Sequence, residues 1–365
     1  MAEVIGARAG RIRRAVVALL AVAAVAAVVP GSASAVPRSF YGLVPNTDLA
    51  ADDYQLIRQA GVGTSRVSVF WQVIEQRNDE FDWTATDQQI GELAASNIRA
   101  LPDLFGTPAW LANNPATPPV GSDRQQAEWS EFIGRAVRRY GPGGTYWTEV
   151  YPTQQPGAGP LPIETWQVWN EVNGPKHFHP KPDVGKYAKL LQITNNAIKG
   201  QDSSADILTA GLVSKPTGKG GQPAWTYLKK LLKNKQGKRS FDHVALHPYA
   251  ASDRQIVKDV KRLRRALKKG GKKRAQSWIT EVGWSSLPSG ASPKLSKTPQ
   301  GQAKLLKKTY SRLKKKRGKW KIGGVYWYTW RDFGGGICDW CPDAGLVKSN
   351  LEPKPAYRAY RGVAR

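Results

Sequence analysis

TWQVWNE, residues 165–171, is the stretch that decides the fold: an apolar run that stops abruptly at Asn170 and Glu171. Such a short run predicts a buried strand, and its polar end places a carboxylate where the strand leaves the sheet. The stretch WITE, residues 278–281, has the same pattern and ends in Glu281. In a barrel of parallel strands the carboxyl ends meet at one mouth. We therefore expect Glu171 and Glu281 to share one site.

Eight short β-rich runs alternate with amphipathic helical patterns along the chain. Strands that alternate with helices favour a parallel sheet, and eight strands close a TIM barrel. The expected fold is therefore α/β, a (β/α)8 TIM barrel, as a single domain over residues 36–365. The expected strands are Phe40–Val44, Ser65–Phe70, Ile98–Leu104, Thr165–Trp169, Ile207–Leu212, His243–Pro248, Ser277–Glu281 and Gly324–Trp330. The expected helices are Ala51–Ala60, Asp87–Ser96, Arg124–Tyr140, Val184–Lys199, Trp225–Lys235, Arg254–Lys269 and Gln300–Lys316.

Residues 1–35 have the composition of a secretory signal peptide. Four arginines between positions 8 and 14 precede an apolar segment at 15–29, and Ala33-Ser34-Ala35 matches a cleavage site. We expect cleavage before Val36 and a secreted, extracellular protein. An uncleaved anchor is the alternative, but the apolar run is shorter than the ~20 residues that a spanning helix needs. No later stretch of the sequence qualifies as transmembrane.

The charge is divided unevenly along the chain. Residues 36–175 carry 9 Lys and Arg against 16 Asp and Glu, whereas residues 176–365 carry 42 against 11. The basic residues form stripes on predicted helices whose leucines face the core. A solvated helix face is the plain interpretation, and adhesion to an anionic cell-wall polymer or another polyanion is the sharper one. The sequence contains no dedicated nucleic-acid module.

Two carboxyl groups on either side of one bond are what glycosidic cleavage requires. One must be protonated to release the leaving oxygen, and the other must be ionised to attack the anomeric carbon. Each glutamate taken alone could be a structural charge at a strand end. Taken together, at the fourth and seventh of eight strands, Glu171 and Glu281 favour catalysis.

The sequence resembles the clan A glycoside hydrolases, barrel enzymes with an Asn-Glu acid/base on strand four and a Glu nucleophile on strand seven. It looks closest to family 39-like and family 5-like secreted bacterial proteins, and the resemblance runs from Phe40 to Tyr357. Val172 departs from the Pro common at that position, and strand three ends in Asp103 without the His typical of family 5. The motifs that carry the resemblance are RYGP at 139–142, WQVWNE at 166–171, HPY at 247–249, TEVGW at 280–284 and WYTW at 327–330.

The resemblance implies a retaining glycosidase that acts on an extracellular poly- or oligosaccharide without a cofactor or a metal. Glu171 is then the general acid/base and Glu281 the nucleophile, with carboxyl groups about 5–5.5 Å apart. As an acid, Glu171 must stay protonated. We expect burial near Trp169 and the charge of Glu281 to raise its pKa.

Four residues match supporting positions of the family. Arg66 would hold Glu281 ionised, because a guanidinium lowers the pKa of a neighbouring carboxyl group. Asn170 would bond the 2-hydroxyl of the substrate. Tyr249 would donate a hydrogen bond to Glu281, and His247 would lie against the acid/base or the sugar.

Aromatic side chains are expected to line the cleft, because sugar C–H faces pack on flat rings. Trp330 matches the strand-eight platform of the family, and Trp110 and Trp284 are the other substrate-binding candidates. A core position is the plain alternative for each. His177 and His179 follow strand four as an H-x-H pair. No acidic cluster follows them, so substrate contact or solvent exposure is favoured over a metal site.

Cys338 and Cys341 form a C-x-x-C motif in a glycine-rich loop after the eighth strand. In an oxidising compartment this motif predicts a local disulfide rather than a redox site. A zinc site would need two further ligands at the usual spacing, and the sequence has none there.

The rival hypothesis is a non-catalytic barrel whose cationic flank binds cell-wall or other polyanionic polymer. The intact Asn170, Glu171 and Glu281 favour the enzyme, because a protein that only binds has no need of this set.

Overall fold

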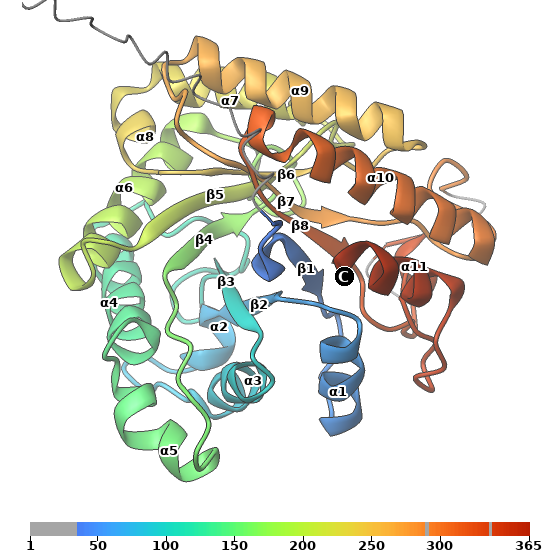
Figure 1. Ribbon diagram of the computed structural model, residues 1–365. Coiled ribbons are helices and arrows are strands. Elements are labelled where there is room, and N and C mark those ends of the chain that lie inside the picture. Colours follow the sequence, from blue (N-terminus) through green and yellow to red (C-terminus); the bar gives the residue numbers. More distant parts are fainter. Residues whose placement is uncertain (1–34, 289–291, 336–337) are drawn as a thin grey trace, which may run out of the picture. The chain divides into compact units, whose positions relative to one another are not determined.

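The eight expected strands close into a barrel: each strand pairs in parallel with the next, and β1 pairs with β8 (Figure 1). The computed structural model describes residues 35–288, 292–335 and 338–365. The expected signal peptide therefore lies outside the described residues, apart from Ala35. Helices connect the strands and surround the barrel, which confirms the (β/α)8 TIM barrel.

The strands begin and end close to the expected positions, except that β8 ends two residues before Trp330. They are β1 Tyr41–Val44, β2 Thr64–Phe70, β3 Arg99–Phe105, β4 Thr165–Asn170, β5 Asp206–Val213, β6 Val244–His247, β7 Ser277–Val282 and β8 Ile322–Tyr328. The helices are α1 Ala51–Gln59, α2 Trp71–Ile74, α3 Thr84–Ala95, α4 Asp123–Tyr140, α5 Tyr151–Gln154, α6 Val184–Gln201, α7 Ala224–Lys233, α8 Lys235–Arg239, α9 Asp253–Lys269, α10 Pro299–Trp320 and α11 Pro355–Ala364. The helices α2, α5, α8 and α11 are additional to the expected set.

Large side chains fill the inside of the barrel. Leu101, Leu208 and Tyr326 are buried in one apolar cluster there. The ring of Tyr326 lies where a Cβ on Gly42 would sit, only 2.3 Å away, so the tyrosine packs directly against the bare backbone of β1. Removing this apolar surface from water stabilises the closed barrel.

Aromatic packing between α4 and the sheet fixes the end of β4. The helix begins after Ser122, whose hydroxyl accepts a hydrogen bond from the backbone N–H of Gln125 at 3.2 Å. Its buried face presents Trp129 to Trp169, with 5.9 Å between the ring centroids. Trp169 is fully buried just before Asn170 and Glu171, so the packing of α4 helps to set where these two residues leave the strand.

No helix among the described residues is both long and apolar enough to cross a lipid bilayer.

Candidate active site

The backbone turns sharply where β4 ends. Trp169 and Glu171 have φ angles of 69° and 43°, in the left-handed region that residues other than glycine rarely adopt. The indole N–H of Trp169 donates to the carbonyl of His177 at 2.7 Å and holds the following loop against the strand end. This loop geometry brings His177 next to Glu171.

Two histidines contact the carboxylate of Glu171, one at each oxygen. Nδ1 of His247 lies 2.9 Å from Oε1, and Nδ1 of His177 lies 3.0 Å from Oε2. His177 was expected to contact substrate or solvent, and its role beside Glu171 could not be read from the H-x-H spacing. His179 lies apart from this pair, with Nδ1 3.3 Å from the amide nitrogen of Asn114.

The carboxylate of Glu281 has a different set of partners. Arg66 donates from Nη1 to Oε1 at 2.6 Å, and the hydroxyl of Tyr249 donates to Oε2 at 2.5 Å. Arg66 also donates to Asp103 at 2.6 Å and to Asn170 at 3.1 Å. The guanidinium therefore links the ends of β2, β3, β4 and β7.

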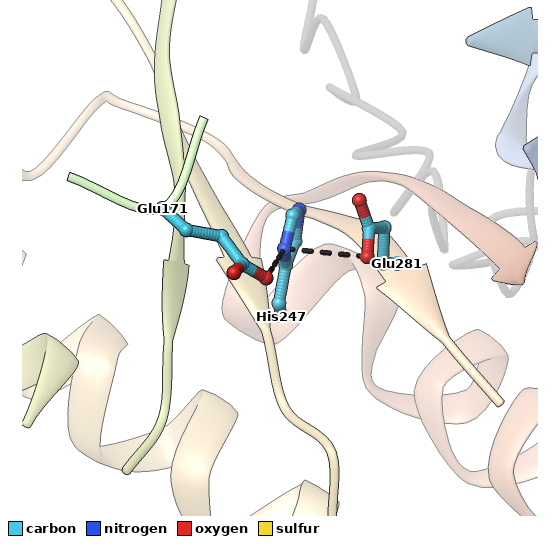
Figure 2. Close-up of side chains that lie close together, drawn as sticks. All are labelled: Glu171, His247 and Glu281. Atoms are coloured by element: carbon cyan, nitrogen blue, oxygen red, sulfur yellow. Dashed lines mark hydrogen bonds and ion pairs between the residues drawn. The ribbon is translucent and has the colours of Figure 1, made fainter. Parts of the chain in front are cut away.

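His247 lies between the two glutamates and is fully buried (Figure 2). Its Nδ1 is 3.5 Å from Oε2 of Glu281, and its Nε2 is 3.0 Å from the hydroxyl of Thr280. The imidazole occupies space that only a glycine on β5 leaves open, because a Cβ at Gly211 would come within 1.9 Å of Nε2. The strand β5 thus positions His247 without contributing a side chain.

The structure corrects the expected electrostatics of Glu171. Burial raises the pKa of Glu171, but the hydrogen bonds and positive charge that His177 and His247 supply lower that pKa more, so the net shift is downward. The expectation of a raised pKa is therefore wrong in direction, because sequence reasoning did not place the two histidines.

The groups around Glu281 keep one protonation state. Burial lowers the pKa of Arg66, but the carboxylates of Asp103 and Glu281 raise it more, so the guanidinium stays charged. Burial and the charge of Glu281 raise the pKa of Tyr249 well above its ordinary value, so the phenol remains a hydrogen-bond donor.

Two of the three expected tryptophan platforms lie in the core. Trp284 and Trp330 are fully buried, and their indole N–H groups donate to the carbonyl of Ala250 at 2.7 Å and to Asp53 at 2.6 Å. The prediction is wrong for both, because neither ring is exposed to a substrate. Trp330 follows the end of β8 at Tyr328, and its indole points to Asp53 on α1. Trp110 is partly exposed, packs on Trp71 and has Arg124 over its ring; its contact with substrate remains a prediction.

Other aromatic residues lie beside Glu281. The ring of Trp340 is 4.9 Å from that of Tyr249 and 6.1 Å from that of Tyr328, centroid to centroid. Neither Tyr328 nor Trp340 was among the site residues expected from the sequence. The signal for Tyr328 was its position two residues before Trp330, at the end of an alternating strand.

The central cluster also has the spacing of a metal site, since one ligand atom each from Glu171, His247 and Glu281 lie within 4.8 Å of one another. However, protein groups already bond to these atoms or to their neighbours, including Tyr249 and Thr280. A second cluster with the spacing of a metal site consists of Glu75 and Asp79, which follow α2, and Glu128 on α4. We therefore interpret the central cluster as a network of protein side chains that bond to one another.

Solved structures that share the fold of this barrel include glycoside hydrolases. A family 39 glycoside hydrolase from the gut symbiont Bacteroides cellulosilyticus WH2 superimposes with a TM-score of 0.67 at 20% identity, over 90% of this chain and 63% of that one. A monomeric beta-xylosidase from Caulobacter crescentus CB15 gives 0.63 at 19% identity, over 88% and 67%. The chain shares its fold with these glycosidases. This chain spans about two thirds of the length of each of these two proteins.

A family 5 structure also shares the fold. The GH5_18 protein from Streptomyces cattleya, solved with Manb1-4GlcNAc, has a TM-score of 0.61 at 15% identity, over 86% of this chain and 74% of that one. No protein-family model matches the sequence, and no curated protein sequence does either. These likenesses confirm, at the level of the fold, the resemblance to families 39 and 5.

Proposed function

We propose that the protein is a retaining glycoside hydrolase that cleaves O-glycosidic bonds of an extracellular poly- or oligosaccharide. The observation that carries the proposal is the spacing of two carboxylates: an oxygen of Glu171 lies within 4.8 Å of an oxygen of Glu281. Retaining enzymes hold these groups about 5–5.5 Å apart, whereas inverting enzymes need about 6.5–9.5 Å to admit the attacking water. The close pair therefore favours retention.

In the first step, an oxygen of Glu281 bonds to the anomeric carbon while the bond from that carbon to the leaving oxygen breaks. Glu171 gives its proton to the leaving oxygen. Arg66 and Tyr249 favour this step because their hydrogen bonds fix both oxygens of Glu281. Asn170, whose side-chain oxygen accepts a hydrogen bond from Arg66, would bond the 2-hydroxyl of the sugar.

In the second step, Glu171 takes a proton from water, and the resulting hydroxyl displaces Glu281 from the sugar. The lowered pKa of Glu171 favours this step, because the ionised carboxylate is the form that acts as a base. The first step needs the protonated form instead. Substrates with poor leaving groups should therefore be cleaved faster as the pH falls.

Product stereochemistry tests the mechanism directly. Proton NMR of the reaction should detect first the sugar with the anomeric configuration of the substrate. A first product of inverted configuration would overturn double displacement even if both glutamates proved essential. The first substrates to test are aryl xylosides and mannosides, since a xylosidase and a protein solved with a mannose-containing disaccharide share the fold.

Export is part of the proposal, because the expected cleavage site precedes the barrel. Secreted material should begin at Val36 on N-terminal sequencing. A secreted protein that retains Met1 and the apolar segment would contradict cleavage.

A second candidate function, binding of an anionic cell-wall polymer, is favoured by the packing of two basic helices. Neighbouring helices α9 and α10 carry eight and nine Lys or Arg residues, against two acidic residues on α9 and none on α10 (Figure 1). A hollow of about 400 Å³ on this surface is lined by Lys304, Lys307, Lys308, Ser311 and Arg312.

Salt dependence tests this second candidate. Binding by release of counterions must weaken steeply as salt rises, so affinity for anionic cell-wall polymer that is constant from low to high salt refutes it. Charge reversal should weaken adhesion and leave turnover of a neutral aryl glycoside unchanged. The residues to reverse are Lys258, Lys261, Arg262 and Arg265.

A further inference from the structure

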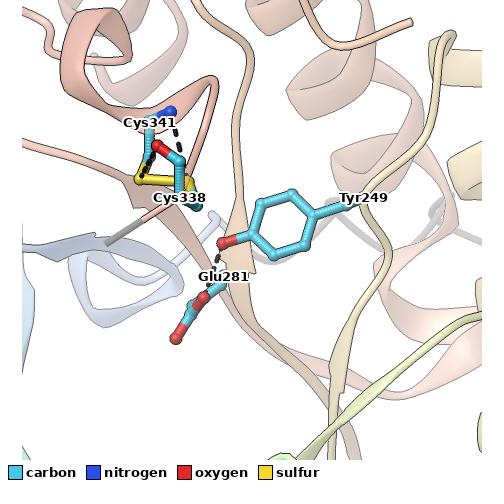
Figure 3. The surroundings of a disulfide bond; sticks show 4 residues. All are labelled: Tyr249, Glu281, Cys338 and Cys341. Carbon is cyan, nitrogen blue, oxygen red and sulfur yellow. Dashed lines mark hydrogen bonds between the residues drawn. A yellow bond between two sulfur atoms is a disulfide. The ribbon is translucent and has the colours of Figure 1, made fainter. Parts of the chain in front are cut away.

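The disulfide between Cys338 and Cys341 encloses Trp340 in the loop that follows β8. Cys341 is fully buried, and Trp340 is only 8% exposed. Figure 3 draws the disulfide with Tyr249 and Glu281, whose side chains meet through the hydroxyl of the tyrosine. The loop thus brings an indole to the residue that holds the proposed nucleophile.

Trp340 packs where three strand ends meet. Its ring lies 4.9 Å from the ring of Tyr249, which follows β6, with 62° between the planes, and 6.1 Å from the ring of Tyr328 on β8. Directly after β7, a Cβ at Gly283 would lie 3.6 Å from the edge of the indole, which is van der Waals contact. The indole therefore packs against the Tyr249 ring and limits its movement.

The segment after Trp340 is anchored to the barrel. The carbonyl of Asp343 accepts hydrogen bonds from the backbone and hydroxyl of Ser286, at 2.9 and 3.0 Å, and from Lys354 at 3.0 Å. The disulfide ties Cys338 to this anchored segment, and the backbone N–H of Cys341 also donates to the sulfur of Cys338 at 3.2 Å. Trp340 is thereby fixed from both sides.

We propose that Trp340, held by the Cys338–Cys341 disulfide, is a positioning residue that keeps the Tyr249 hydroxyl on Glu281. Arg66 restrains one oxygen of the carboxylate, and Tyr249 restrains the other. Loss of the indole frees the tyrosine ring and then the carboxylate, which misaligns the attack on the sugar. The inference rests on the proposed glycosidase function.

A double-mutant cycle tests the coupling between Trp340 and Tyr249. Trp340→Ala should lower kcat about 10–100-fold on an aryl glycoside, because small misplacements of a reacting group have effects of this order. In a Tyr249→Phe background the same change should lower kcat by less than about twofold, since the hydroxyl it positions is already gone. Trp340→Phe should restore most of the activity. The proposal is overturned if Trp340→Ala lowers kcat by the same factor in the wild type and in the Tyr249→Phe background. An unchanged kcat in Trp340→Ala also overturns it.

Trp320 provides a matched control for loss of a large buried ring. It is 9% exposed at the end of α10, before β8 begins, whereas Trp340 lies in the loop after β8 ends. Trp320→Ala should lower the melting temperature as Trp340→Ala does, but leave kcat within about twofold of the wild type. An equal loss of kcat in both variants would mean that Trp340 acts only through stability.

Reduction tests the disulfide. A dithiol reductant supplies two electrons and two protons, so that the protein disulfide becomes two thiols and the reductant becomes a cyclic disulfide. Reduced wild type and Cys338→Ser/Cys341→Ser should both lose kcat severalfold, and reduction should not change Trp340→Ala further. Full activity after reduction overturns the role of the disulfide.

One further variant separates failure of this inference from failure of the proposed function. Wild type that is inactive on every glycoside, or activity that survives Glu281→Gln, refutes the function and the inference with it. An active wild type with an inactive Glu281→Gln variant and an insensitive Trp340→Ala variant refutes the positioning role alone.

Discussion

The two glutamates at the mouth of the barrel are held by opposite kinds of partner. Arg66 and Tyr249 bond Glu281 at 2.6 and 2.5 Å, and burial and charge fix both partners in one protonation state. Glu171 lies between two imidazoles at 2.9 and 3.0 Å; burial raises the pKa of Glu171, but these two contacts lower that pKa more. The difference matches the chemistry: a nucleophile needs a constant charge, whereas an acid/base must change its charge in every cycle.

Removal of the nucleophile should have the largest effect. Glu281→Gln leaves Arg66 and Tyr249 in place but removes the attacking charge, so we expect kcat to fall on the order of 10⁴-fold or more for every substrate. Steady-state rates on aryl glycosides with good and poor leaving groups measure it. If kcat fell only for substrates with poor leaving groups, Glu281 would be the acid/base and Glu171 the nucleophile.

Removal of the acid/base should have a smaller effect that depends on the substrate. Glu171→Gln should lower kcat by about 10²–10⁴-fold where the leaving group needs a proton, and much less for an activated aryl glycoside. Added azide should rescue the second step and yield a glycosyl azide of retained configuration. Absence of any rescue would argue against Glu171 as the base.

Removal of one histidine should shift the pH profile. His177 lowers the pKa of Glu171, so His177→Gln should raise that pKa. The protonated acid then persists to higher pH, and the alkaline limb of kcat/KM should move upward. Profiles on a substrate with a poor leaving group check this, with His179→Gln as the control because His179 contacts Asn114. A downward shift would contradict the assigned contact.

The smallest effect on activity is expected at Trp330, outside both glutamate environments. Trp330→Phe removes a 2.6 Å hydrogen bond to the buried carboxylate of Asp53, which should cost about 1–3 kcal/mol in the free energy of unfolding. KM should not change, because the ring is not in the cleft. Urea unfolding and substrate kinetics measure the two quantities, and a raised KM would restore Trp330 as a sugar platform.

The sequence predicted the barrel because eight short β-rich runs alternate with amphipathic helical patterns, and two of these runs lead into Glu171 and Glu281. The contacts of Arg66 and Tyr249 with Glu281 were implied by the resemblance to clan A glycoside hydrolases, and both are present in the structure. His177 could not be predicted as a partner of Glu171, because its position depends on backbone turns with positive φ and one indole hydrogen bond.

The tryptophan platforms show a second reason why sequence reasoning fails. Strand alternation gives the direction of a side chain only within the strand, and β8 ends before Trp330. Trp340 lies in a loop, where no periodicity gives direction. Its place beside Tyr249 depends on the disulfide and on the anchoring of Asp343.

The pairing of β1 with β8 has a consequence for how the chain folds. The contact between Arg66 and Glu281 spans 215 residues, and the hydroxyl of Thr329 donates to the carbonyl of Val44 across 285 residues. Loops of such length must close before these contacts form, which slows folding relative to proteins built from local contacts. Until β8 docks on β1, both strands are open edges whose unpaired N–H and C=O groups invite association between chains. Closure of the barrel, which brings Glu281 to the guanidinium of Arg66, thus also removes the aggregation-prone edges.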